Sequence, residues 1–197
     1  MIKKVFIYSF LIISSFITLV PFLWMIGASF MFDGNASVFP PVFLPDPFTF
    51  IQYKTLLERL NITQNFFNSL TLSVTVTLVS LLFNSMAGYA FAKYRFKGKS
   101  FLFNLLLSSM IIPSQVTMLP LFLMLKSMGL INTYMAIVIP GMANIFGIFL
   151  IRQYCLAIPD SLIEAARIDG ATDFQIYRKV ILPLAVPILV TLAIFSF

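Results

Sequence analysis

The sequence predicts an all-α protein, a polytopic bundle of membrane-spanning helices, and three observations lead to this fold class. Hydrophobic residues make up 60% of the chain and charged residues 10%, with a mean hydropathy of +0.99. A soluble domain carries about 25% charged residues. Several apolar runs are long enough to cross a hydrocarbon core of about 30 Å, and no Asp, Glu, Lys or Arg interrupts them. A membrane bundle therefore accounts for the composition.

Four apolar runs are long enough to be complete spans, and a fifth run is shorter. The expected complete spans are residues 5–32, 66–92, 101–125 and 133–151. The fifth run, 184–197, would reach only about 21 Å at about 1.5 Å per residue. We therefore expect residues 1–197 to form one membrane domain that is truncated within its fifth span.

The first run follows Lys3 and Lys4, an arrangement that is also typical of secretory signal peptides. Such signals have an apolar region of roughly 7–15 residues, which the first run exceeds. No Ala-x-Ala cleavage site is evident. A retained span is therefore favoured over a cleaved signal, which would leave the mature chain beginning outside the membrane.

The segment between the first two spans, 33–65, has a proline-rich first half and a second half with helical spacing. Prolines between positions 40 and 47 fix backbone angles and remove donors, so an irregular loop is expected there. Apolar residues between Phe48 and Leu60 recur at helical spacing and predict a short amphipathic helix at the membrane surface. A packed connector is favoured over a dedicated docking helix.

Small and polar residues gather on one face of the second expected span. Steps of four, three, four and three residues join Ser73, Thr77, Ser80, Asn84 and Ala87. This face is expected to meet protein or water, and helix packing is favoured over lining of a transport pathway. Asn84 is the best candidate for a lining residue.

The third expected span contains a polar patch bounded by prolines at 113 and 120. Broken helices at membrane depth occur only where protein or a cavity satisfies the freed backbone groups. A structural kink is favoured, and a role of this patch, which includes Gln115, in a transport pathway is the alternative.

The basic residues predict the orientation, because they concentrate on the cytoplasmic side of a membrane. With the N-terminus inside, only Lys54, Arg59 and Lys126 fall outside. The remaining ten of the 13 basic residues fall inside: Lys3, Lys4, Lys93, Arg95, Lys97, Lys99, Arg152, Arg167, Arg178 and Lys179. This topology explains the net charge of +6 without a nucleic-acid partner.

The residue types argue against several classes of activity. Histidine is absent and Cys155 is the only cysteine, so a metal site has little support and Cys155 is expected to be a small buried hydrophobe. Gly98-Lys99-Ser100 ends like a phosphate-binding loop, but Lys93 stands where that motif needs glycine. No catalytic residue, metal or bound cofactor is predicted in this chain. Ion-driven transport is disfavoured because the expected spans hold no Asp, Glu, Lys or Arg.

Residues 160–183 form the one long polar segment after the fourth expected span, and they predict two short helices joined by a bend. Ser161 and Glu164 fit a capping box, so the first helix is expected to begin at Ser161. Gly170 can end this helix in the left-handed conformation. Thr172 or Asp173 then caps a second helix, Phe174–Ile181.

The spacing in this elbow resembles the EAA loop of ATP-binding-cassette (ABC) importer permeases. That pattern is Glu-Ala-Ala, three residues, Gly, nine residues, then Ile-x-Leu-Pro, and here Val180 replaces the Ile. The resemblance extends along the chain and narrows to the MalG-like permeases of carbohydrate importers. It is carried by Pro21–Met25, Ala87–Ala92, Ile112-Pro113, Gly129–Thr133 and Glu164–Gly170.

The resemblance implies a MetI-like membrane bundle with six spans and a set of partners. These are two cytoplasmic ABC ATPase subunits that hold ATP and Mg, a second homologous permease, an extracytoplasmic solute-binding protein and the lipid of a bacterial cytoplasmic membrane. The elbow would couple to an ATPase, and Asn84, Gln115 and Asn144 would approach the solute pathway. The implied coupling residues are Glu164, Ala165, Ala166, Asp169, Gly170, Ala171, Leu182 and Pro183.

Two other functions remain open at this stage. The elbow is shared across ABC importers, so the solute could be an amino acid or a peptide instead of a sugar. A membrane scaffold that uses the elbow for docking without moving a solute is the alternative from another class.

Overall fold

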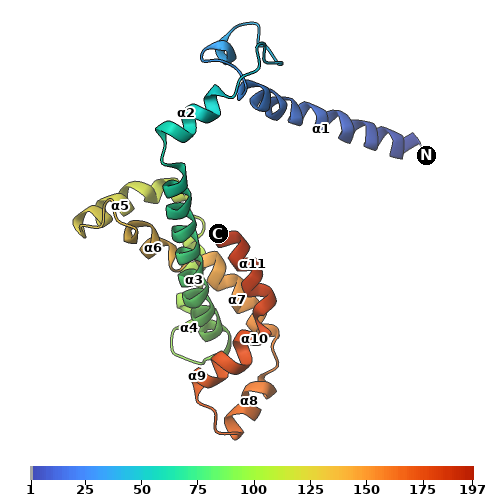
Figure 1. The fold of residues 1–197 in the computed structure, drawn as a ribbon. Coiled ribbons are helices and arrows are strands. Elements are labelled where there is room, and N and C mark those ends of the chain that lie inside the picture. Colours follow the sequence, from blue (N-terminus) through green and yellow to red (C-terminus); the bar gives the residue numbers. More distant parts are fainter. Residues whose placement is uncertain (1) are drawn as a thin grey trace. The chain divides into compact units, whose positions relative to one another are not determined.

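The computed structural model describes residues 2–197, which form helices and loops with no β-strand among them. This part of the chain divides into two compact units, one ending at Phe67 and the other comprising Asn68–Phe197. Three helical stretches are long and apolar enough to cross a membrane, and up to five if each bent pair of helices counts as one span. Figure 1 shows the helices of both units.

The first unit consists of one long apolar helix, an irregular loop and a short helix. Helix α1 (Ile2–Ala28) ends four residues before the boundary expected at residue 32. Phe30 stacks on Phe48 with ring centroids 4.5 Å apart, and an edge of Phe50 also faces Phe30. Helix α2 (Ile51–Arg59) confirms the predicted short helix after the proline-rich loop.

Helix α3 (Ile62–Lys93) is the longest helix and covers the expected second span. Thr77, Ser80 and Asn84 of its small and polar face are buried, and Ser73 and Ala87 are half-buried. Most of this face therefore packs against protein.

The stretch expected as a single span at 101–125 instead forms two helices, α4 (Lys99–Ser109) and α5 (Ser114–Ser127), bent by 103°. Pro113 stands at the N-cap of α5 in an extended conformation with ψ of 133°. Because proline has no amide hydrogen and disfavours a helical residue before it, the helix ends and restarts there. The polar patch is thus a sharp break, and Pro120 is accommodated inside α5.

The next apolar stretch contains α6 (Met135–Gly141) and α7 (Ile145–Ala157), which together make a candidate span of 23 residues. The helix extends beyond residue 151, the expected end, and therefore includes Arg152. The Arg152 guanidinium lies 4.0 Å from the centre of the Phe103 ring, and its Nε donates to the Phe91 carbonyl at 3.1 Å. These contacts satisfy the one cation of a largely apolar helix.

The chain then forms the polar elbow and its final helices. These are α8 (Asp160–Ile168), α9 (Asp173–Ile176), a π-helical turn (Tyr177–Ile181), α10 (Leu182–Leu184) and α11 (Val186–Ser196). The stretch from Asp173 to Leu184 meets α11 at a bend of 78°. Within the second unit, α8 and α9 lie at one end and α5 and α6 at the other (Figure 1).

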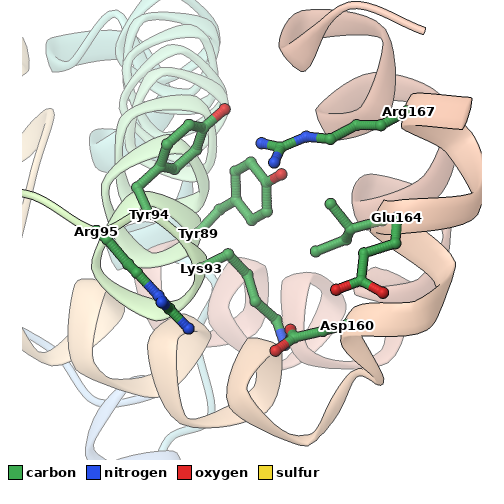
Figure 2. A pocket seen from close by; sticks show the side chains of 8 residues that line it. Tyr89, Lys93, Tyr94, Arg95, Asp160, Glu164 and Arg167 are labelled. Atoms are coloured by element: carbon green, nitrogen blue, oxygen red, sulfur yellow. The ribbon is translucent and has the colours of Figure 1, made fainter. Parts of the chain in front are cut away.

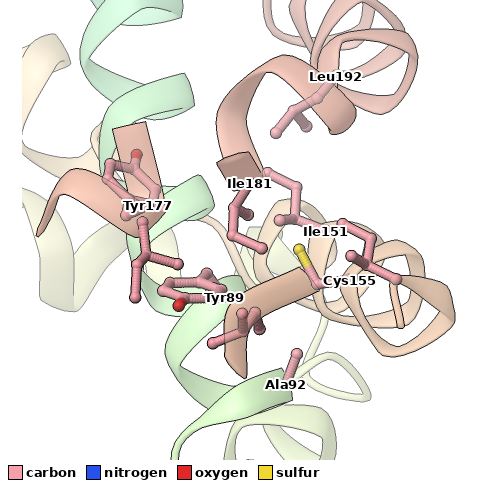
Figure 3. Packing of buried hydrophobic residues seen from close by; sticks show 10 residues of the cluster. Tyr89, Ala92, Ile151, Cys155, Tyr177, Ile181 and Leu192 are labelled. Carbon is pink, nitrogen blue, oxygen red and sulfur yellow. The ribbon is translucent and has the colours of Figure 1, made fainter. Parts of the chain in front are cut away.

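A buried apolar cluster ties the elbow to the helices above it (Figure 3). Tyr89 of α3, Ile151 of α7, Ile181 of the π-helical turn and Leu192 of α11 all belong to it. Cys155 is fully buried in the same cluster, which confirms its expected role as a small hydrophobe. The second unit therefore has one core, and the elbow is built onto that core.

Candidate functional site

The bend of the elbow is a well-formed helix terminus at Gly170. The Ala171 amide donates to the Ala166 carbonyl and the Gly170 amide donates to the Arg167 carbonyl, each at 3.0 Å. This is the hydrogen-bond pattern of a Schellman motif, in which the residue after the helix takes a left-handed conformation. Gly170 has φ of 80°. The predicted turn is confirmed, and Ala166 and Ala171 both pack on the core cluster beside it.

The two arms of the elbow begin differently. Thr172 caps the second arm in a capping box, accepting from the Gln175 amide while the Gln175 side chain accepts from the Thr172 amide. The capping box expected at Ser161 is wrong, because α8 begins at Asp160 with Pro159 as its N-cap. Pro159 has no side-chain acceptor, so the first turn relies instead on the Asp160 carboxylate near its positive end.

Helix α8 has one face on the core and another in the open. Ile163 is buried at 8% exposure, whereas Ile168 is 86% exposed and Leu162 is 43% exposed. Glu164 and Ala165 are also exposed. The elbow thus presents apolar side chains and a carboxylate on a polar segment, a combination typical of a protein–protein contact.

A cavity of about 450 Å³ separates the start of the elbow from the end of α3 (Figure 2). Arg167 and Glu164 both extend from α8, Arg167 towards Tyr89 and Tyr94, and Arg95 lies on the opposite side of the opening (Figure 2). Cations and carboxylates both line the space. The lining residues are Tyr89, Lys93, Tyr94, Arg95, Asp160, Ile163, Glu164 and Arg167.

One ion pair crosses an edge of this cavity. Lys93 Nζ lies 2.5 Å from Asp160 Oδ1 and donates to the Ile158 carbonyl at 2.6 Å. The hydrogen bond and charge of Lys93 lower the pKa of the Asp160 carboxyl. A second pair joins the two arms, with Arg167 3.0 Å from Asp173.

The remaining implied coupling residues occupy different environments. Glu164 makes no hydrogen bond or ion pair with the residues 2–197 that the structure describes, so its carboxylate is available to a partner. Asp169 and Pro183 are exposed, and Leu182 is half-buried against the core cluster.

Sequence reasoning missed three residues that attach the elbow to the bundle: Lys93, Ser85 and Tyr177. Ser85 and Tyr177 are buried, and their hydroxyl oxygens lie 2.7 Å apart. The basic cluster around Lys93 was visible but indicated only orientation. Ser85 directly follows Asn84 of the predicted polar face, and this position was the available signal for it.

The structure joins two of the three candidate pathway residues and leaves the third outside their network. Asn84 is fully buried; it donates to Ser80 Oγ at 2.8 Å and accepts from the Asn144 amide at 3.0 Å. Asn144 in turn caps α7 by accepting from the Gly147 amide. Gln115 is exposed in the first turn of α5. The contacts of Asn84 and Asn144 support the break between α6 and α7.

The described residues contain no group of His, Cys, Asp or Glu side chains arranged to hold a metal ion.

An all-α bundle with broken apolar helices and a polar elbow defines a class of protein, the membrane permeases of ABC importers. Residues 84–197 match the family described as "Binding-protein-dependent transport system inner membrane component". The chain belongs to this family.

Similar proteins support the same assignment. The arabinooligosaccharides transport system permease protein AraQ of Halalkalibacterium halodurans is 40% identical over 187 residues, covering 91% of this chain and 66% of AraQ. The diacetylchitobiose uptake system permease protein NgcG of Streptomyces coelicolor is 32% identical over 197 residues, covering 96% of this chain and 63% of NgcG. The chain thus spans just under two thirds of the length of either relative.

A solved structure shares the fold along nearly the whole chain. It is the crystal structure of a bacterial ABC transporter involved in the import of the acidic polysaccharide alginate. The similarity has a TM-score of 0.85 and 30% sequence identity, and it covers 99% of this chain and 69% of the other.

Proposed function

We propose that this chain is a permease subunit of an ATP-driven, binding-protein-dependent importer, and that its elbow couples it to a separate ATPase. The observation that carries the proposal is the elbow itself. Its Schellman turn fixes two helices at one end of the second unit, and α8 leaves a carboxylate without a partner in the described chain beside a highly exposed Ile168.

The chemistry of the elbow suits docking in a cleft. Glu164 offers a carboxylate to a basic group, and the small side chain of Ala165 permits close approach of the partner's backbone. Ile168 supplies apolar area that would be removed from water, worth about 25 cal/mol per Å² buried. Asp169, Gly170 and the stretch through Pro183 hold the second arm at its angle.

The proposed assembly follows from the family resemblance. Two cytoplasmic ABC ATPase subunits would hold ATP and Mg, hydrolyse the nucleotide and move the elbow as they close. A second homologous permease would complete the pathway, and an extracytoplasmic solute-binding protein would deliver the solute. The distribution of basic residues supports a cytoplasmic N-terminus and a cytoplasmic elbow in a bacterial inner membrane.

The proposed solute is a sugar or an oligosaccharide. The names of AraQ and NgcG refer to arabinooligosaccharides and diacetylchitobiose, and the solved transporter is involved in the import of an acidic polysaccharide. Growth of a deletion strain on single carbon sources tests this. Loss of growth on an oligosaccharide supports the proposal, whereas loss of amino-acid or peptide uptake alone would assign another solute.

Asn84, Gln115 and Asn144 remain proposed pathway residues; Gln115 and Asn144 are exposed, whereas Asn84 is buried. Alanine at Gln115 is the cleanest test, since it removes no described tertiary contact. Weaker solute affinity would support the role. Unchanged affinity in alanine variants at all three positions would remove it.

The coupling proposal is tested by purifying the tagged protein with its partners in mild detergent. Wild-type protein should retain a P-loop ATPase and a second permease, and Glu164→Lys should lose the ATPase while the second permease stays. Glu58→Lys is the matched control, because Glu58 is an exposed glutamate in α2, outside the elbow. If partners are retained but no ATPase activity depends on the elbow, the result would favour a membrane scaffold.

A further inference from the structure

Helix α3 contacts both arms of the elbow through polar side chains as well as through the core. The first contact is the Lys93 ammonium at the end of α3, and the second is the Ser85 hydroxyl two turns earlier. Both contacts lie within the second unit. The two contacts reach different arms, so together they define the orientation of the elbow on α3.

Lys93 fixes the linker that joins α7 to α8. Its side chain is only 10% exposed, and its Nζ contacts the carbonyl of Ile158, the C-cap of α7, and the carboxylate of Asp160, the first residue of α8. These two acceptors flank Pro159. One ammonium therefore holds both ends of the linker and sets the angle between the two helices.

Ser85 holds the second arm. Its hydroxyl oxygen lies 2.7 Å from the Tyr177 hydroxyl oxygen, and the two residues are 3% and 6% exposed. Tyr177 begins the π-helical turn, and the centroid of its ring lies 5.9 Å from the ring centroid of Tyr89 on α3. A buried hydrogen bond with ring packing around it fixes the rotation of this turn.

The cavity makes the Lys93 contact important for the first arm. A cavity of about 450 Å³ lies between α8 and the end of α3. Side chains that line a cavity lack van der Waals contacts on that side, so packing resists a tilt of α8 less there. Ile163 and Ala166 hold α8 on the core cluster, and the Lys93–Asp160 pair is the described ion pair that joins α8 to α3. A force on α8 is therefore resisted at the edge of the cavity by this pair.

We propose that Lys93 and Ser85 are positioning residues that hold the two arms of the elbow on α3, so that a movement of the docked elbow turns this helix. The functional part rests on the proposed coupling of the elbow to an ATPase. The positions of the arms do not, and they can be measured separately.

The test measures the distance between spin labels on α8 and α3 in the purified complex. Labels at Ser161→Cys and Met86→Cys use two exposed positions, and the unmutated chain controls for labelling of the buried Cys155. Wild type should give a narrow distance distribution, and Lys93→Met should lose it. Arg95→Met is the matched control, because it removes a cation that lines the same cavity.

Rescue separates positioning from a general loss of structure. Lys93→Glu combined with Asp160→Lys reverses the pair and should restore the narrow distribution, and Lys93→Arg should retain it. For the second arm, labels at Lys179→Cys and Met86→Cys should show the same loss in Tyr177→Phe. An unchanged distribution in Lys93→Met, or failure of the reversed pair to restore it, would overturn the inference for Lys93.

Retention of the ATPase in the same samples distinguishes the two proposals. Lys93→Met leaves the exposed face of α8 intact, so it should keep the ATPase while solute transported per ATP falls. A wild-type complex that holds no ATPase would contradict the proposed function. A complex that keeps the ATPase, with identical distributions in wild type and Lys93→Met, would contradict only the positioning role.

Discussion

Substitution of Gly170 isolates the conformation of the elbow from its surface chemistry. Gly170 has φ of +80° and a β-carbon there would meet no atom within 4 Å, so Gly170→Ala is costly only through its backbone. An L-residue in the left-handed region costs about 1–2 kcal/mol. Alanine also has less conformational freedom than glycine in the unfolded chain, which offsets about 0.4–1 kcal/mol of that cost. If the whole net cost of about 1 kcal/mol is expressed in docking, the affinity for the ATPase falls about fivefold.

The assay is titration of the ATPase onto the permease complex in lipid nanodiscs. Gly129→Ala is the matched control, because Gly129 also has positive φ and open space around its α-carbon but lies outside the elbow. Gly170→Asn should fall between glycine and alanine, since Asn tolerates this conformation. Gly170→Pro should abolish coupling because proline also removes the amide that donates to Arg167. Equal affinities for wild type and Gly170→Ala, or an equal loss in Gly129→Ala, would refute the reasoning.

Two further predictions concern stability and pH. Gly88→Ala should lower the thermal unfolding midpoint of the detergent-purified protein, because a β-carbon would lie 2.8 Å from Ile151 and such overpacking costs about 1–3 kcal/mol; an unchanged midpoint would contradict the close approach of α3 and α7. The Lys93 hydrogen bond lowers the Asp160 pKa from its ordinary 3.8. The contribution of this ion pair to stability is therefore fully present above pH 3.8 and is lost as the pH falls through the lowered pKa. The label distance between α8 and α3 should therefore stay constant from pH 7 to 5 and change only in acid; a change centred near neutrality would contradict this.

The elbow was largely predictable because its signals are local. A glycine at a helix end and Thr172 before a helical stretch both act through backbone hydrogen bonds within a few residues. Ser161 shows the limit of this reasoning. It matched a capping pattern, but Pro159 placed the helix start one residue earlier and a carboxylate that bonds to Lys93 took the first position.

The breaks and attachments depend on contacts between distant residues, and hydropathy does not report these. Pro113 and the polar residues after it indicated a kink, but hydropathy gave no sign of its angle of 103°. Asn84 and Asn144 are separated by 60 residues and meet at the α6–α7 break. Lys93 was counted as a sign of orientation, because its partner Asp160 lies 67 residues further along the chain.

A photo-crosslinker placed at Ala165 tests the central claim most directly. Ala165 is exposed on α8 beside Glu164, so it should lie against the partner if the elbow docks as proposed. The captured protein is identified by mass spectrometry from membranes that contain the whole transport system, with a crosslinker at the exposed Leu57 of α2 as the control position. The account predicts a crosslink to a P-loop ATPase from Ala165 and none from Leu57. Labelling of Ala165 by lipid alone, or an ATPase crosslink of equal strength from Leu57, would contradict it.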